Sequence, residues 1–134
     1  MRRYLLDSNI WIYAMKGRHP EVRKTLEAQA LANVHLSTVV LGELAFGWAS
    51  SQKPADTRRR VQEFLARFPR LGIDDDVAQT YGGLRQTLQS QGKPIGMNDF
   101  WIAAQALTHK LVLVTNNTRE FSRVPQLKIE NWLA

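Results

Sequence analysis

Short apolar runs alternate along this chain with longer stretches whose apolar residues recur at helical spacing. The apolar runs predict strands at residues 4–6, 34–36, 71–73 and 111–114, and a last edge strand at residues 127–129. The continuous apolar run at 111–114 is typical of a strand buried on both faces. Helices are predicted over residues 10–15 and 21–31, then after the capping residues Ser37 or Thr38, after Pro54, after residues 74–76, and from Asn98 and Asp99 onward.

This alternation predicts an α/β fold with a central, mainly parallel sheet covered by helices on both faces. Active sites in such sheets lie beyond the carboxyl ends of the strands. Asp7 follows the first predicted strand and residues 115–117 follow the fourth, so two segments far apart in sequence are expected in one cleft.

Length, composition and charge limit the kinds of domain, metal site and partner that this chain can have. With 134 residues, we expect one domain spanning residues 1–134, and with no cysteine, disulfides and thiolate metal sites are excluded. The apolar run at the N-terminus is too short for a signal peptide or a membrane span, so we expect a cytoplasmic protein. The net charge of +6 favours a polyanionic partner, although a solubilising surface would explain it equally well.

Three carboxylates lie on or beside apolar elements. Asp7 precedes a helix and Asp99 opens one, so each could simply be a helix cap. Glu43 has only Val39, Val40, Phe46 and Gly47 as its helical neighbours, and a buried carboxylate must be paired, protonated or bound to a metal. Together the three acids predict a site for a hard divalent cation such as Mg²⁺.

Other residues give weaker signals. The three histidines are scattered without ligand spacing, and the acids at 74–76 are most simply a solvated helix cap. Lys93 follows Gly92, but no earlier glycine stands at the spacing that a nucleotide-binding phosphate loop needs, and no cysteine nucleophile exists.

Four segments resemble one family when taken together. They are residues 6–10 (LDSNI), 37–44 (STVVLGEL), 94–104 (PIGMNDFWIAA) and 114–121 (VTNNTREF). In this order and spacing they resemble the VapC toxins of bacterial toxin–antitoxin pairs, which are PIN-domain ribonucleases. The resemblance implies a three-layer α/β/α sandwich, Mg²⁺ or Mn²⁺ held by Asp7, Asp99 and Glu43, a homodimer, and a VapB-type antitoxin that fills the active-site groove. The fourth segment and residues 130–132 are similar to the branch that cuts the anticodon loop of initiator tRNA.

One position departs from the family pattern, because Asn117 stands where many members have an aspartate. Glu120 is an alternative fourth catalytic acid, and the sequence leaves open which of the two fills that position and whether one or two metal ions bind. We expect Glu43 to act as general base or to orient water, and Ser8, Thr115 and Asn117 to support the acids. The candidate RNA-binding residues are Arg85, Lys93, Arg119 and Arg123.

Several rival functions stay open. A dehalogenase-like phosphatase would need a second aspartate at position 9, where this chain has Asn9. A non-catalytic nucleic-acid-binding regulatory protein suits the charge but gives no reason for Glu43. A DNA-directed, structure-specific nuclease is a third alternative, since no feature of the sequence indicates recognition of the 2′-hydroxyl that distinguishes RNA from DNA. The RNA substrate, the cleaved bond, the particular antitoxin and the stoichiometry are not determined by the sequence.

Overall fold

A five-stranded parallel sheet forms the centre of the computed structural model, which describes residues 2–133. Its strands lie in the order β3-β2-β1-β4-β5, and every neighbouring pair is parallel. The bounds are β1 Tyr4–Leu6, β2 Val34–Ser37, β3 Arg70–Leu71, β4 Val112–Val114 and β5 Ile129–Glu130. The predicted α/β fold with a mainly parallel sheet is therefore confirmed.

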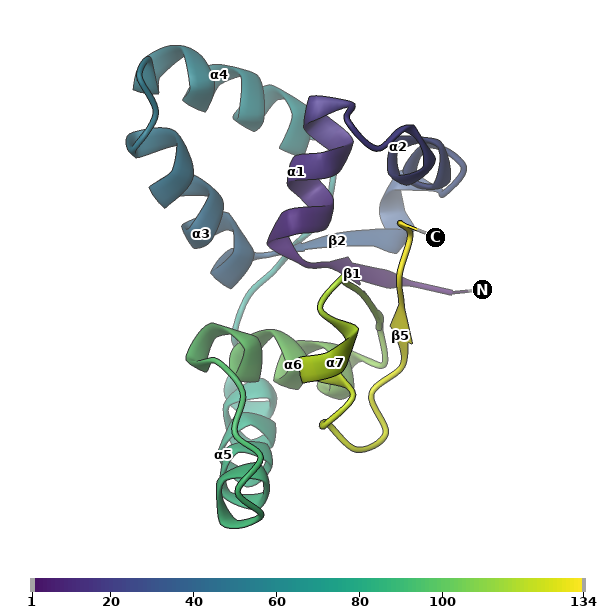
Figure 1. The fold of residues 1–134 in the computed structure, drawn as a ribbon, viewed down its shortest axis with the longest axis vertical. Coiled ribbons are helices and arrows are strands. Elements are labelled where there is room, and N and C mark those ends of the chain that lie inside the picture. Colours follow the sequence, from purple (N-terminus) through teal and green to yellow (C-terminus); the bar gives the residue numbers. More distant parts are fainter. Residues whose placement is uncertain (1, 134) are drawn as a thin grey trace.

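Helices cover both faces of this sheet. They are α1 Ser8–Lys16, α2 Pro20–Glu27, α3 Thr38–Ala49, α4 Pro54–Leu65, α5 Asp75–Ser90, α6 Met97–His109 and the short α7 Thr118–Phe121, with a 3₁₀ turn at Leu31–Asn33. Figure 1 shows α1 and α2 on one side of the sheet and α5 and α6 on the other, while α3 and α4 form a hairpin beside α1. This is the three-layer α/β/α arrangement expected from the sequence.

The central strands are buried because helices cover both of their faces. All residues of β1 and β4 are buried, and the largest fully buried side chains include Trp11, Phe100 and Phe121. Trp11 contacts Phe68 edge-to-face, with ring centroids 4.8 Å apart. No helix among residues 2–133 combines the length and the apolar character needed to cross a membrane.

The helix predicted over residues 21–31 was too long, because α2 ends at Glu27. The side-chain amide of Gln29 donates to the Thr25 carbonyl at 3.2 Å and so satisfies a group of the last turn. The backbone then becomes extended at Ala30, with ψ at 134°. Only the 3₁₀ turn Leu31–Asn33 follows before β2.

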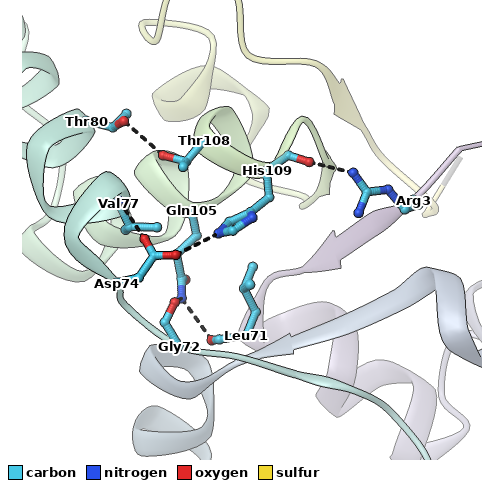
Figure 2. Close-up of polar contacts among 9 residues, drawn as sticks. All are labelled: Arg3, Leu71, Gly72, Asp74, Val77, Thr80, Gln105, Thr108 and His109. Carbon is cyan, nitrogen blue, oxygen red and sulfur yellow. Dashed lines mark hydrogen bonds and ion pairs between the residues drawn. The ribbon is translucent and has the colours of Figure 1, made fainter.

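The third strand was predicted at residues 71–73 but occupies Arg70–Leu71. The strand ends here because the backbone carbonyls of Leu71 and Gly72 accept hydrogen bonds from a buried side-chain amide on α6. Gln105 Nε2 donates to the carbonyls of Leu71 and Gly72, each at 3.0 Å, as Figure 2 shows for this side chain and its two partners. The last strand is also displaced, from residues 127–129 to Ile129–Glu130, which is within the usual uncertainty of element ends.

Gln105 is fully buried and joins α6 to the edge of the sheet. Its Oε1 accepts a hydrogen bond of 2.6 Å from the hydroxyl of Ser37, the residue that caps α3. The amide therefore satisfies its own polar atoms with three partners, in a place where an unpaired polar group would be costly. This fixes α3, which carries Glu43, against α6, which carries Asp99.

The C-terminus of α6 ends with a lysine in the left-handed backbone region. Lys110 has φ 56° and ψ 45°, and the amide of Leu111 donates back to the Ala106 carbonyl at 2.9 Å. This is the Schellman pattern of helix termination, whose left-handed position is usually glycine. A side chain there costs about 1 kcal/mol or more relative to glycine.

Candidate active site

Asp7 lies at the point where β1 ends and α1 begins. Its Oδ1 accepts a hydrogen bond of 2.8 Å from the Ser8 amide, which makes Asp7 the N-cap of α1. Its Oδ2 accepts from the hydroxyl of Thr115, at 2.9 Å. Thr115 is fully buried and directly follows β4, so the two neighbouring strands meet at this carboxylate, as the parallel topology predicts.

Burial raises the pKa of Asp7 above its usual value. The hydrogen bonds from Ser8 and Thr115 act in the opposite direction, because they stabilise the charged form. The negative charges of Glu43 and Glu120 raise the pKa further. The Asp7 carboxylate therefore accepts two hydrogen bonds and also lies within the electrostatic influence of Glu43 and Glu120.

Glu43 comes from α3 and reaches the same cleft. Its Oε1 accepts a hydrogen bond of 2.7 Å from the Ser8 hydroxyl, so Ser8 contacts Asp7 through its amide and Glu43 through its side chain. The face around Glu43 is less buried than the sequence suggested, because Phe46 is 76% exposed. Glu43 is half-buried, at the border between the apolar face and solvent.

Asp99 lies in the first turn of α6, a helix that buries six of its residues against the rest of the protein. Its pKa is raised to about 7. The largest cause is burial, followed by the charges of Glu120 and Asp7, a hydrogen bond with Glu120, and the charge of Glu43. Four carboxylates thus repel one another across one cleft.

Glu120, on α7, is held by two donors. Its Oε1 accepts a hydrogen bond of 2.7 Å from the Gly96 amide, and its Oε2 accepts from the side-chain amide of Asn117. Asn117 therefore supports Glu120, and it is Glu120 that faces Asp99. Between the two residues considered for the fourth acidic position, the geometry places Glu120 among the acids.

Gly96 was missed by the sequence reasoning. A Cβ at this position would lie 3.1 Å from Asp99 Oδ2 and 3.8 Å from Glu120 Oε1, closer to the Asp99 oxygen than side chains normally approach. Glycine lets the backbone pass beside both carboxylates while its amide binds one of them. Its position three residues before Asp99 and directly before a helix was the available signal.

The donor chemistry of the cleft fits a hard divalent cation. Asp7, Glu43, Asp99 and Glu120 provide carboxylate oxygens, the ligands that Mg²⁺ and Mn²⁺ prefer, and a cation would offset the repulsion that raises the pKa of Asp99. Among residues 2–133 no three histidine, aspartate or glutamate side chains are arranged closely enough to form a metal site as they stand. Separate hydrogen-bond partners hold Asp7, Glu43 and Glu120.

The four candidate RNA-binding cations differ in how the protein holds them. Arg85 donates to the Tyr81 hydroxyl at 2.8 Å, and Arg123 donates to the Pro94 carbonyl at 2.9 Å. Lys93 and Arg119 are exposed. Arg119 and Arg123 flank Glu120 in sequence, whereas Arg85 lies on α5. Asp74, Asp75 and Asp76 stay away from the cleft, with Asp74 capping α5 through a bond of 2.9 Å to the Val77 amide.

A groove of about 760 Å³ opens from Glu43 and Ser8 along α1, α3 and α4. Apolar side chains line much of it, and three cations lie along it: Lys16, Arg18 and Arg60. One end of this groove therefore reaches the acidic cleft, and the rest offers an apolar and basic surface.

Comparison with known proteins agrees with this fold and cleft. Residues 4–127 match the PIN domain. The chain belongs to the PIN-domain family, and within it to the VapC branch. It is 38% identical over 133 residues to a protein of Haemophilus influenzae named Ribonuclease VapC2, covering 99% of this chain and 100% of that protein.

Two further relatives extend the comparison. The protein of Shigella flexneri named tRNA(fMet)-specific endonuclease VapC is 36% identical over 132 residues, covering 98% of this chain and 99% of that protein. Among solved structures, the DNA-bound VapBC of Salmonella typhimurium superposes with a TM-score of 0.91 at 33% identity, covering 98% of this chain and 99% of that one. The family resemblance seen in the four sequence segments is confirmed.

Proposed function

We propose that this protein is a divalent-metal-dependent endoribonuclease and the toxin of a toxin–antitoxin pair. The observation that carries the proposal is the meeting of Asp7, Glu43, Asp99 and Glu120 beyond the carboxyl ends of β1 and β4, with the pKa of Asp99 raised to about 7. Acids that repel one another at a shared cleft suit a site that binds a cation. The relatives are named as a ribonuclease and a tRNA endonuclease, and these names support the same proposal.

Asp7, Asp99 and Glu43 would hold the ion, Mg²⁺ or Mn²⁺. When bound, it neutralises charge that develops on the phosphate and lowers the pKa of water. Thr115 fixes the Asp7 carboxylate, so its second oxygen is oriented before substrate arrives. Glu43, held by the Ser8 hydroxyl, would accept the proton of the attacking water. Gly96 and Asn117 keep Glu120 facing Asp99.

We further propose that the substrate is tRNA, with the anticodon loop of the initiator tRNA as the cleavage site. The name of the Shigella flexneri relative supports this choice, and a loop supplies the unstacked nucleotides that a narrow acidic cleft can admit. Such a substrate is cytoplasmic. The positive net charge of +6 would draw RNA to the acidic cleft.

The partner we propose is a VapB-type antitoxin, in an assembly with a homodimer of this chain. The solved relatives are toxin–antitoxin complexes, which supports this. The groove along α1, α3 and α4 suits an amphipathic segment that carries acids opposite Lys16, Arg18 and Arg60. Because this groove begins at Glu43, its occupant would also cover the catalytic acids.

A cleavage assay tests the proposal. Purified, antitoxin-free protein is incubated with bacterial tRNA, with Mg²⁺ or with EDTA, beside Asp7→Asn and the control Asp76→Asn, which removes an exposed carboxylate of the same type. Discrete fragments that require Mg²⁺ and are lost only in Asp7→Asn support the nuclease, and the fragment ends identify the bond. Intact tRNA under every condition, from folded protein, contradicts it and favours a binding role.

A further inference from the structure

A second pocket lies at the amino-terminal ends of the strands, whereas the acidic cleft lies at their carboxyl ends. It has a volume of about 520 Å³ and is formed where β1, β4 and β5 begin, at their amino-terminal ends. Its charged lining residues are Arg2, Arg3, Lys110, Lys128 and Glu130. Four cations from three separate parts of the chain thus face one concave surface, against one acid.

The two arginines of this pocket are already held by the protein. Arg2 pairs with Glu130, which neutralises the only carboxylate of the lining. Arg3 donates to the His109 carbonyl at 2.8 Å, at the end of α6, as Figure 2 shows. Lys110 and Lys128 make no side-chain hydrogen bond or ion pair with any other residue of 2–133. The pocket therefore carries two unpaired ammonium groups beside two arginines of fixed position.

The backbone at Lys110 provides an independent observation. Its φ of 56° is one that glycine adopts without strain, and the Schellman pattern that ends α6 requires it. A cation near a helix C-terminus interacts favourably with the helix dipole, which could explain Lys110 alone. That explanation does not extend to Lys128 and Arg2, which come from elsewhere in the chain. A long cation is kept at this strained position, and it lines a basic pocket.

We propose that this basic pocket binds a phosphate of the RNA backbone, at a distance from the bond that is cut. This inference rests on the proposed ribonuclease function. β1 has three residues, so about 10 Å of strand separates its two ends, and a bound RNA extends over more than that. Phosphate contacts of this kind position a nucleic acid without reading its sequence. The pocket would strengthen binding of a folded tRNA but not of a short oligonucleotide confined to the cleft.

The experiment compares two double variants that remove the same charge. Lys110→Gly with Lys128→Gln alters the pocket, and Lys24→Gln with Lys53→Gln removes two exposed lysines elsewhere. Both are made in Asp7→Asn protein, and affinity for unfractionated bacterial tRNA is measured at several NaCl concentrations. The pocket variant is expected to bind more weakly and to flatten the slope of log affinity against log salt by roughly 0.7 to 1, the change expected for the loss of one phosphate contact.

Thermal unfolding provides the folding control. Glycine suits the backbone of residue 110, so the pocket variant should melt no lower than its parent, and weaker binding cannot then be ascribed to misfolding. Cleavage is measured with the same double variants made in protein that retains Asp7. Their cleavage of a short single-stranded RNA should match that of the wild-type protein with Mg²⁺, while cleavage of tRNA by the pocket variant shows a raised KM.

Two results separate the two proposals. Equal salt slopes and affinities in the pocket and control variants overturn the phosphate pocket, even if the wild-type protein cleaves RNA. A wild-type protein that cleaves neither RNA overturns the proposed nuclease, and the binding data on tRNA then still decide whether the basic pocket holds a polyanion.

Discussion

Replacing Asp99 by asparagine should stabilise the metal-free protein at alkaline pH. Burial, together with the repulsion from Glu120, Asp7 and Glu43, raises the pKa of Asp99 from 3.8 to about 7. Asparagine has the same shape without the charge, and it can donate to Glu120 as the protonated acid does. The variant therefore removes the repulsion while keeping the packing.

The magnitude follows from the size of the pKa change. A rise of about 3 pH units corresponds to about 4 kcal/mol at 1.36 kcal/mol per unit. Asp99 is only half-buried, so water and salt screen part of this repulsion and about 2 kcal/mol is expected. Because the folded state binds this proton more tightly than the unfolded state, the contribution of Asp99 to the stability of the wild-type protein is largest below pH 3.8 and is lost as the pH rises to about 7.

Urea unfolding in EDTA at pH 4.5 and at pH 8 measures this difference. At pH 8 the midpoint of Asp99→Asn should exceed that of wild type by about 1 M urea, for a slope near 2 kcal/mol per molar. At pH 4.5 the gain should shrink to about 0.5 kcal/mol, because wild-type Asp99 is then mostly protonated. Asp76→Asn, at an exposed position, should show no such pH dependence. An equal gain at both pH values, or a less stable variant at pH 8, would refute the repulsion argument.

Three further substitutions test the supports of the cleft. Gln105→Leu removes the hydrogen bonds of this side chain to the Ser37 hydroxyl and to two carbonyls, so unfolding free energy should fall by about 2–3 kcal/mol in urea titrations, and a loss below 0.5 kcal/mol would contradict the buried network. Thr115→Val removes a hydroxyl from the Asp7 carboxylate, and kcat/KM on RNA should drop about 10- to 100-fold with the melting temperature nearly unchanged. Gly96→Ala crowds the Asp99 carboxylate, so RNA cleavage should fall at least about tenfold, and unchanged activity would show that the neighbouring backbone can shift without effect.

Much of the layered fold could be predicted because burial repeats at the spacing of the elements. The run at β4 is apolar at every position since helices cover both its faces, and Asp7 follows β1 directly. Parallel strands end at the same edge, so the meeting of Asp7 with Thr115 also followed from the order of the elements. Here local pattern and tertiary structure agree, and the prediction needed no distant contact.

The errors arise where a distant side chain decides the local structure. β3 is shorter than its apolar pattern suggested because Gln105, 34 residues away from Leu71, takes the next carbonyls. Nothing in the sequence marks Gln105 as buried, since a polar residue in a helix is usually exposed. The end of α2 likewise depends on a side-chain hydrogen bond from Gln29. The closeness of Gly96 to two carboxylates is visible only once α6 and α7 are placed together.

The order of the strands has a consequence for synthesis of this protein. Of the five strands of this sheet β1 is made first, yet its neighbour β4 comes more than 100 residues later, and the Thr115 hydroxyl that fixes Asp7 is made with it. A nascent chain that still lacks residues 112–130 contains neither β4 nor β5, and it lacks Glu120 as well. The acidic cleft therefore assembles only after residues 112–130 have been synthesised, and a nascent chain that ends before them is not yet able to cut RNA.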